Sequence, residues 1–205
     1  MRKIFALTLS TLFIFSYSRA DQVQIAGKWA ADTRTKGGLG SSWVFEKDGT
    51  ATYTFGALVD FKYQVEGKTI KTIFENSTTG KSETDLQSFE ILGNKLIIDP
   101  SEPEKRQEMN RVGNAISNAV PLVGIWEFKH YTGAMATMQY TTTGLAQLSV
   151  PFQNTKGKYR LRSNELIIML DGQSDATKKI QLNGDQLVFL PNSKDGELKY
   201  SRVLP

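Results

Sequence analysis

The amino-acid sequence contains the same pattern twice, and this internal repeat constrains the fold more than any other feature. Gly27-Lys28-Trp29 returns as Gly124-Ile125-Trp126. Arg111-Val112, near the end of the first copy, returns as Arg202-Val203. Self-similarity of this kind indicates repeated structural units, so we expect two similar units that follow one another along the chain.

Alternation of apolar and polar residues dominates both copies and predicts an all-β fold. In the stretch 58–66, Val59, Phe61 and Tyr63 alternate with polar and charged residues. This pattern is typical of an antiparallel strand with one face on a core and one in water. Counting such runs between turn sequences predicts about eight short strands per copy. In the first copy they lie near residues 25–30, 41–47, 50–56, 58–66, 69–74, 84–92, 95–99 and 106–112, and a matching set covers 123–203.

The repeat and the strand pattern together predict two tandem, short, eight-stranded up-and-down antiparallel barrels. We expect the first barrel over residues 21–112 and the second over 122–205. Residues 113–121 form the expected linker, with a short helical turn, because Ile116 and its neighbouring alanines precede Pro121. A single merged barrel, with each copy as one half, is the alternative.

Residues 1–20 have the features of a cleaved secretory signal peptide. Arg2 and Lys3 precede an apolar run, and Ser18-Arg19-Ala20 offers small residues at the cleavage site. The chain has no Cys, so it has neither disulfides nor the lipid-anchor cysteine of a bacterial lipoprotein. We therefore expect a periplasmic or secreted protein with no stable membrane span after cleavage.

Net charge gives no sign of a nucleic-acid partner. Removing the three basic residues of the signal leaves 22 basic against 21 acidic residues. These charges are interspersed along the chain, whereas nucleic-acid binding calls for a clustered basic surface. We therefore expect no nucleic acid among the partners.

A Gly-x-Trp on the first strand with an Arg on the last strand resembles the structural signature of the calycin superfamily. This group covers lipocalins, fatty-acid-binding proteins, avidins and small bacterial lipocalin-like domains, some of unknown function. The resemblance implies short barrels, each closed by an Arg side chain packed across the indole of its own copy. By this resemblance Trp29 pairs with Arg111, and Trp126 pairs with Arg202.

The inward-facing residues of the predicted strands are the candidate ligand-lining residues. An eight-stranded barrel is about the size at which side chains fill the interior or leave room for one small ligand. The candidates are Tyr53, Phe55, Phe61, Tyr63, Met138, Tyr140, Leu148 and Tyr159.

The sequence shows no catalytic machinery. His130 is the single histidine, and it has no partner set for zinc or for general-base chemistry. We therefore expect no catalytic residues, no metal and no cofactor. The favoured function is an exported, non-catalytic binding module for a small apolar ligand or a protein partner. A protease-inhibitor-like protein with Asp21 to Gln24 as its plug and an envelope structural protein are the alternatives, and an enzyme is the least favoured class.

Overall fold

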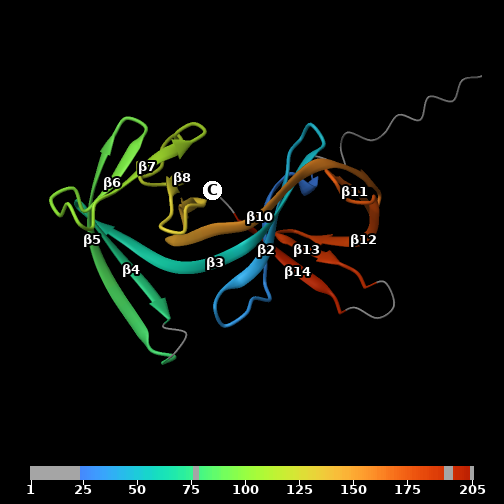
Figure 1. Ribbon diagram of the computed structural model, residues 1–205, viewed down its shortest axis with the longest axis horizontal. Coiled ribbons are helices and arrows are strands. Elements are labelled where there is room, and N and C mark those ends of the chain that lie inside the picture. The colour runs from blue at the N-terminus through green and yellow to red at the C-terminus, as the bar shows by residue number, and fades with distance from the viewer. Residues whose placement is uncertain (1–23, 76–78, 192–195, 204–205) are drawn as a thin grey trace, which may run out of the picture.

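The computed structural model describes residues 24–75, 79–191 and 196–203 and confirms that the chain is all-β. Fourteen antiparallel strands form a single closed ring (Figure 1). The predicted signal peptide, residues 1–20, lies outside the described residues. Among the described residues, no helix is both long and apolar enough to cross a membrane.

Seven strands come from each half of the chain. The first half contributes β1 (Gly27–Ala31), β2 (Leu39–Phe45), β3 (Thr50–Glu66), β4 (Thr69–Glu75), β5 (Ser82–Leu92), β6 (Lys95–Ile98) and β7 (Gln107–Val112). The second half contributes β8 (Gly124–Lys129), β9 (Met135–Tyr140), β10 (Leu145–Arg162), β11 (Glu165–Leu170), β12 (Ala176–Asn183), β13 (Gln186–Phe189) and β14 (Leu198–Val203). The prediction of eight strands per copy was wrong, because residues 50–56 and 58–66 form one continuous strand, β3.

The two longest strands pair with each other across the ring and divide it into two lobes. β3 and β10 run antiparallel from Thr50 opposite Lys158 to Lys62 opposite Leu145, and they join the two ends of the molecule (Figure 1). Lobe A consists of β1, β2, residues 50–57 of β3, residues 153–162 of β10, and β11 to β14. Lobe B consists of β4 to β9 with residues 58–66 of β3 and 145–151 of β10. The junction between the lobes is called the waist below.

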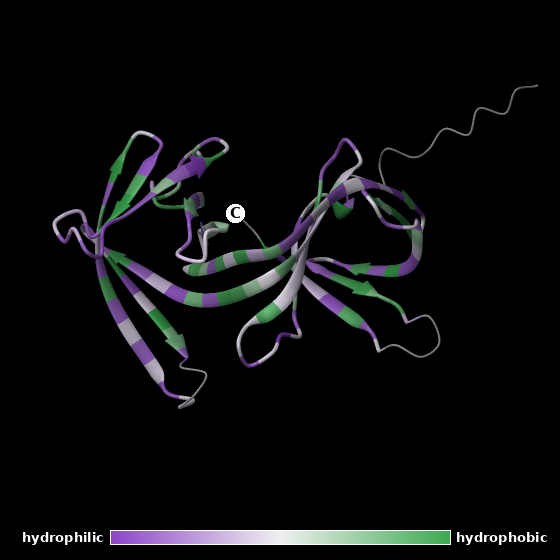
Figure 2. Cartoon of the chain, in the orientation of Figure 1, coloured by the Kyte–Doolittle hydropathy of each residue, from purple (hydrophilic) through white to green (hydrophobic). Residues whose placement is uncertain are grey.

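Each lobe has its own hydrophobic core, and each core combines both halves of the chain. The fully buried side chains of lobe A include Trp29 and Phe45 from the first half and Tyr159 and Leu187 from the second. Apolar and polar residues alternate along the long strands (Figure 2), so one face of each strand reaches a core. The expected division into barrels 21–112 and 122–205 therefore differs from the observed pairing, in which neither half closes on itself.

Each Trp–Arg contact also joins a residue of the first half of the chain to a residue of the second half. The Cζ of Arg202 lies 4.1 Å from the centroid of the Trp29 ring, and that of Arg111 lies 4.0 Å from Trp126. The implied pairs, Trp29 with Arg111 and Trp126 with Arg202, are thus corrected. The physical reason is the strand order: β1 pairs with β14, and β7 pairs with β8.

The structure also explains the glycine of each Gly-x-Trp pattern. Gly27 and Gly124 have φ angles of 133° and 137°, which L side chains rarely adopt. A Cβ on Gly27 would lie 2.7 Å from Nη1 of Arg202, and one on Gly124 would lie 2.5 Å from Nη1 of Arg111. Glycine is therefore required at these two positions, because any side chain there would occupy the space of the arginine guanidinium.

Two tyrosines, one on each long strand, form hydrogen bonds to hairpin turns in the other half of the chain. The Tyr63 hydroxyl donates to the Thr141 carbonyl at 2.6 Å, and the Tyr159 hydroxyl donates to the Glu46 carbonyl at 2.9 Å. The contacts are related by the repeat, since Thr141 and Glu46 both follow the second strand of their copies. Burial raises the pKa of Tyr63, and it raises that of Tyr159 to about 12.

The backbones of β3 and β10 approach each other closely at the waist, and both strands continue through it without a turn. A Cβ on Gly56 would lie 2.2 Å from the Val150 carbonyl oxygen, so only glycine allows the two strands to meet there. β10 also carries a register irregularity between Pro151 and Gln153, and such a bulge bends a strand.

The segment between β7 and β8 joins two paired strands of lobe B. Residues 113–121 contain a turn at Ser117 and Asn118, where Asn118 has a φ of 64°. In place of the predicted helical turn the segment contains non-helical turns, and the predicted interdomain linker lies within one lobe.

Candidate functional site

Aromatic side chains from both halves of the chain gather inside lobe A. Trp43 stacks on Phe45 with ring centroids 5.5 Å apart, and Tyr53 lies 4.8 Å from Trp43. Phe189 meets Trp43 edge-on at 6.2 Å and lies 5.2 Å from Tyr200. β2 and β3 supply the first three residues, and β13 and β14 supply the other two. The ring closure thus brings together residues that are distant in sequence.

A cavity of about 280 Å³ opens over part of this aromatic cluster. Its volume is close to the lower limit of small-molecule sites, which are typically apolar with a few polar groups. The lining fits that description, since it comprises Trp43, Tyr53, Ile168, Leu170, Gln173, Ser174, Ala176 and Lys178. Lys178 is half-buried and supplies a positive charge to the lining.

The Trp43 side chain supplies a hydrogen-bond donor without an acceptor. Its Nε1 is fully buried and, among the described residues, forms no hydrogen bond. Burial raises the pKa of Tyr200, while polar contacts of its hydroxyl with Ser41 and, more weakly, with the Trp43 indole lower it; the Trp43 contact does not have the geometry of a full hydrogen bond. That hydroxyl is instead hydrogen-bonded to the Ser41 hydroxyl at 3.0 Å. A buried donor without a well-aligned acceptor is costly, so a bound molecule whose acceptor meets the indole N–H after a small shift of the Trp43 side chain would stabilise this site.

The corresponding position in lobe B has no indole. Trp43 lies opposite Trp29 in the β1–β2 register, and Met138 lies opposite Trp126 in the β8–β9 register. Near Met138, Tyr140 is buried and packs edge-on against Tyr63 at 5.0 Å. Burial raises the pKa of Tyr140 strongly. The two lobes therefore share a framework but differ in the residue that lies opposite the tryptophan of the Gly-x-Trp pattern.

The structure separates the predicted ligand-lining residues. Only Tyr53 among them lines the lobe A cavity. Tyr159 is buried in the lobe A core, and Phe55 is 38% exposed at the waist. The remaining five lie in or against the lobe B core: Phe61, Tyr63, Met138, Tyr140 and Leu148. Among these, Phe61 also lines a separate cavity of about 480 Å³.

Sequence reasoning missed most of the lobe A lining. Ile168, Leu170 and Lys178 lie on β11 and β12 of the second half, whereas Trp43 and Tyr53 lie on β2 and β3 of the first. Strand alternation alone indicates that each apolar residue faces inward. It does not indicate that strands of opposite halves share one interior.

His130 lies in the turn after β8. Its Nδ1 is 2.9 Å from the Thr132 hydroxyl, and its ring lies 4.1 Å from that of Tyr131. In the part of the chain that the structure describes, no three His, Cys, Asp or Glu side chains are grouped so that they could hold a metal ion.

No protein-family model, curated protein or solved structure matches this chain. The resemblance to the calycin superfamily therefore rests on the Gly-x-Trp and Arg residues described above, and membership stays a prediction.

Proposed function

We propose that this protein is a non-catalytic binding module that takes a small apolar molecule into the lobe A cavity. The observation that carries the proposal is the cavity over Trp43, whose buried indole N–H has no acceptor among the described residues. The ligand would have an aromatic or aliphatic body and a hydrogen-bond acceptor. An acidic acceptor is favoured, because Lys178 lines the same cavity.

The proposal includes an origin for the two lobes. Each lobe is an eight-stranded, lipocalin-like barrel, and the two arose by duplication of one unit. The long strands then exchanged partners, so each barrel is completed by the other copy. The matched Trp–Arg and Tyr–carbonyl contacts of the two lobes support this account. An exported, periplasmic or secreted location remains part of the same proposal.

The binding of 1-anilinonaphthalene-8-sulfonate tests the proposed site. This probe combines an aromatic body with an anionic acceptor, and its emission rises in an apolar site. We expect saturable binding of one equivalent. Ile168→Trp fills the cavity and should weaken binding at least 10-fold. Trp43→Phe keeps an aromatic ring but removes the donor together with part of the apolar indole surface, and it should weaken binding about 3- to 10-fold.

Met138→Leu is the matched control, because Met138 occupies the Trp43 position of lobe B. It should leave the affinity unchanged. Equal binding by the wild-type protein and Ile168→Trp would refute a site in lobe A. Far-ultraviolet circular dichroism and the unfolding midpoint would show that each variant is folded.

A further inference from the structure

A second cavity lies at the waist, and one of its lining residues, Ala146, also belongs to the lobe B core. It has a volume of about 310 Å³ and lies between the outer face of β1 and β14 and the turn that joins β9 to β10. Apolar side chains make much of its lining: Ala30, Leu145, Ala146 and Val203. Polar and charged residues complete it: Arg34, Asp60, Thr141, Thr143, Gln147, Ser201 and Arg202.

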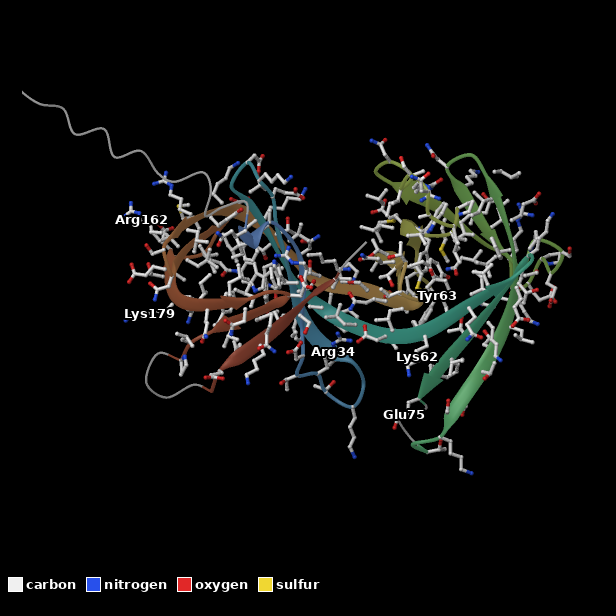
Figure 3. The ribbon with its side chains drawn as sticks, turned by 180° about the vertical axis from the view of Figure 1, so that it is seen from behind. Arg34, Lys62, Tyr63, Glu75, Arg162 and Lys179 are labelled. Carbon is white, nitrogen blue, oxygen red and sulfur yellow. The ribbon has the colours of Figure 1, made fainter. Side chains whose placement is uncertain are left out.

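An ion pair lies at one side of this waist cavity. Nη1 of Arg34 is 2.7 Å from Oδ2 of Asp60, and Arg34 also donates to the Ala31 carbonyl at 3.0 Å. Figure 3 shows Arg34 at the junction of the two lobes. The Arg34 side chain is 17% exposed, compared with 57% for Asp60. The guanidinium is therefore held firmly within reach of the cavity.

Gln147 contributes a buried amide oxygen for which the described part of the chain supplies no hydrogen-bond donor. Its Nε2 donates to Oδ1 of Asp60 at 2.9 Å, which fixes the orientation of the amide. Its Oε1 is buried without a hydrogen-bond donor among the described residues, and the whole residue is only 6% exposed. A buried acceptor of this kind costs stability until a donor reaches it.

Lys28 adds a cation beside the cavity. It lies on the same face of β1 as Ala30 and opposite Val203 of β14, and both of these residues line the cavity. Lys28 is half-buried, and its ammonium forms no ion pair or hydrogen bond with another described residue. Burial lowers its pKa to about 8, against the attraction of Asp60, and Arg34 lowers it further. The other cation of the cavity, Arg202, is already paired with Asp185 at 3.1 Å.

We infer that the waist cavity binds a small carboxylate that carries a hydrogen-bond donor on the carbon next to the carboxyl group and an apolar remainder. This chemistry is shared by apolar α-amino acids and α-hydroxy acids. The carboxylate faces Lys28 and Arg34, where positive charge is in excess. Gln147 lines the cavity, and a small shift of its side chain brings the buried Oε1 within reach of the donor, while the apolar remainder packs against Ala30 and Val203. This site is separate from the one proposed in lobe A and does not depend on it.

Four compounds with the same carbon skeleton test the inference by isothermal titration calorimetry. They are L-leucine, 2-hydroxy-4-methylpentanoate, 4-methylpentanoate, which lacks the donor, and L-leucinamide, which lacks the carboxylate. We expect leucine, the hydroxy acid or both to bind at least 10-fold more tightly than 4-methylpentanoate and leucinamide. Their ranking then identifies the donor. Binding of all four with equal affinity, or of none, would overturn the inference.

Variants locate the binding within the waist. Gln147→Leu should reduce the advantage of the donor-bearing acid over 4-methylpentanoate from at least 10-fold to about 2-fold. Lys28→Met should weaken every carboxylate about 10-fold. Lys179→Met is the matched control, because Lys179 is exposed on β12, far from Arg34 (Figure 3). Wild-type affinity in the first two variants would contradict the assignment.

Proton linkage distinguishes a role of Lys28 in binding from a structural role. A carboxylate beside Lys28 raises the pKa of the ammonium, so at pH 8.5 binding should take up a proton. Titrations in two buffers of different ionisation enthalpy would measure this uptake, and Lys28→Met should abolish it. Ile168→Trp should retain it, because that substitution fills only the lobe A cavity. Absence of uptake in the wild-type protein would count against the placement of the carboxylate.

Discussion

The guanidinium of Arg202 lies over the indole of Trp29, with Cζ 4.1 Å from the ring centroid, and so joins the first strand of lobe A to the last. The same guanidinium donates to the Ala26 carbonyl at 2.6 Å and the Gln24 carbonyl at 2.8 Å. The Trp29 Nε1 donates to the Ile25 carbonyl at 2.8 Å. One compact group of contacts thus closes the strand ring and fixes the start of β1.

This relationship predicts an energetic coupling between Trp29 and Arg202. In a double-mutant cycle with Trp29→Phe and Arg202→Met, the coupling free energy should be about 1 kcal/mol. The same cycle with Trp29→Phe and Arg111→Met should give a value near zero, because Arg111 lies over Trp126 in the other lobe. Denaturant unfolding measures both. A larger coupling of Trp29 with Arg111 than with Arg202 would instead support the arrangement in which each half of the chain forms its own closed barrel.

The meeting point of the long strands should not tolerate a side chain. Gly56→Ala places a Cβ 2.2 Å from the Val150 carbonyl oxygen, which forces the backbones apart. We expect a loss of stability of about 2 kcal/mol or more. Gly37→Ala is the control, since the nearest atom to its Cβ lies at 3.9 Å, and it should change stability by less than about 0.5 kcal/mol. Equal effects in chemical denaturation would argue against the close β3–β10 contact.

Lys28 should give the protein a characteristic dependence of stability on pH. Its folded pKa of about 8 lies below its ordinary value of 10.5, so the unfolded chain binds the proton more tightly. Stability should therefore rise with pH, by on the order of 2 kcal/mol between pH 7.5 and 9.5. Lys28→Met should lack this rise and should be more stable than the wild type at pH 7.5. A stability curve that is the same in both proteins would show that the ammonium is not desolvated.

The two turn-binding tyrosines should contribute similarly. Tyr63→Phe and Tyr159→Phe each remove one donor to a carbonyl of the opposite half, and each should cost about 1 kcal/mol. Tyr53→Phe is a suitable comparison, because Tyr53 is half-buried at the cavity, and it should cost less. The free energy of unfolding at pH 7 measures the three effects. An unchanged free energy of unfolding in Tyr63→Phe and Tyr159→Phe would contradict a stabilising role for these hydrogen bonds between the two halves of the chain.

The sequence predicts the strands well because alternation and turn chemistry are local properties. The expected strand at 69–74 is observed as β4, Thr69–Glu75, and that at 95–99 as β6, Lys95–Ile98. The partner of each strand was not predictable from the repeat. A duplicated pattern offers Trp29 an equivalent Arg in either copy, so both pairings satisfy the same local contacts.

The continuity of β3 distinguishes these pairings, and Gly56 permits the close approach of β3 to β10 at the waist. The Gly56-Ala57 sequence looks like a break between two strands, whereas Gly56 is in fact extended and paired with Pro151. For the same reason the lobe A cavity could be predicted only in part. Strand alternation predicts that Tyr53 faces inward. Its position in one cavity with side chains of β11 and β12 depends on the pairing of strands from opposite halves of the chain.

Native mass spectrometry of the protein isolated from its own host tests the central claim, that the lobe A cavity holds a small apolar ligand, most directly. The wild-type protein is expected to carry one adduct of a few hundred daltons, and Ile168→Trp prepared in the same way is expected to have lost it. The Met138→Leu protein should keep the adduct. A bare mass in the wild type, or an adduct that survives the filling of the cavity, would contradict the account.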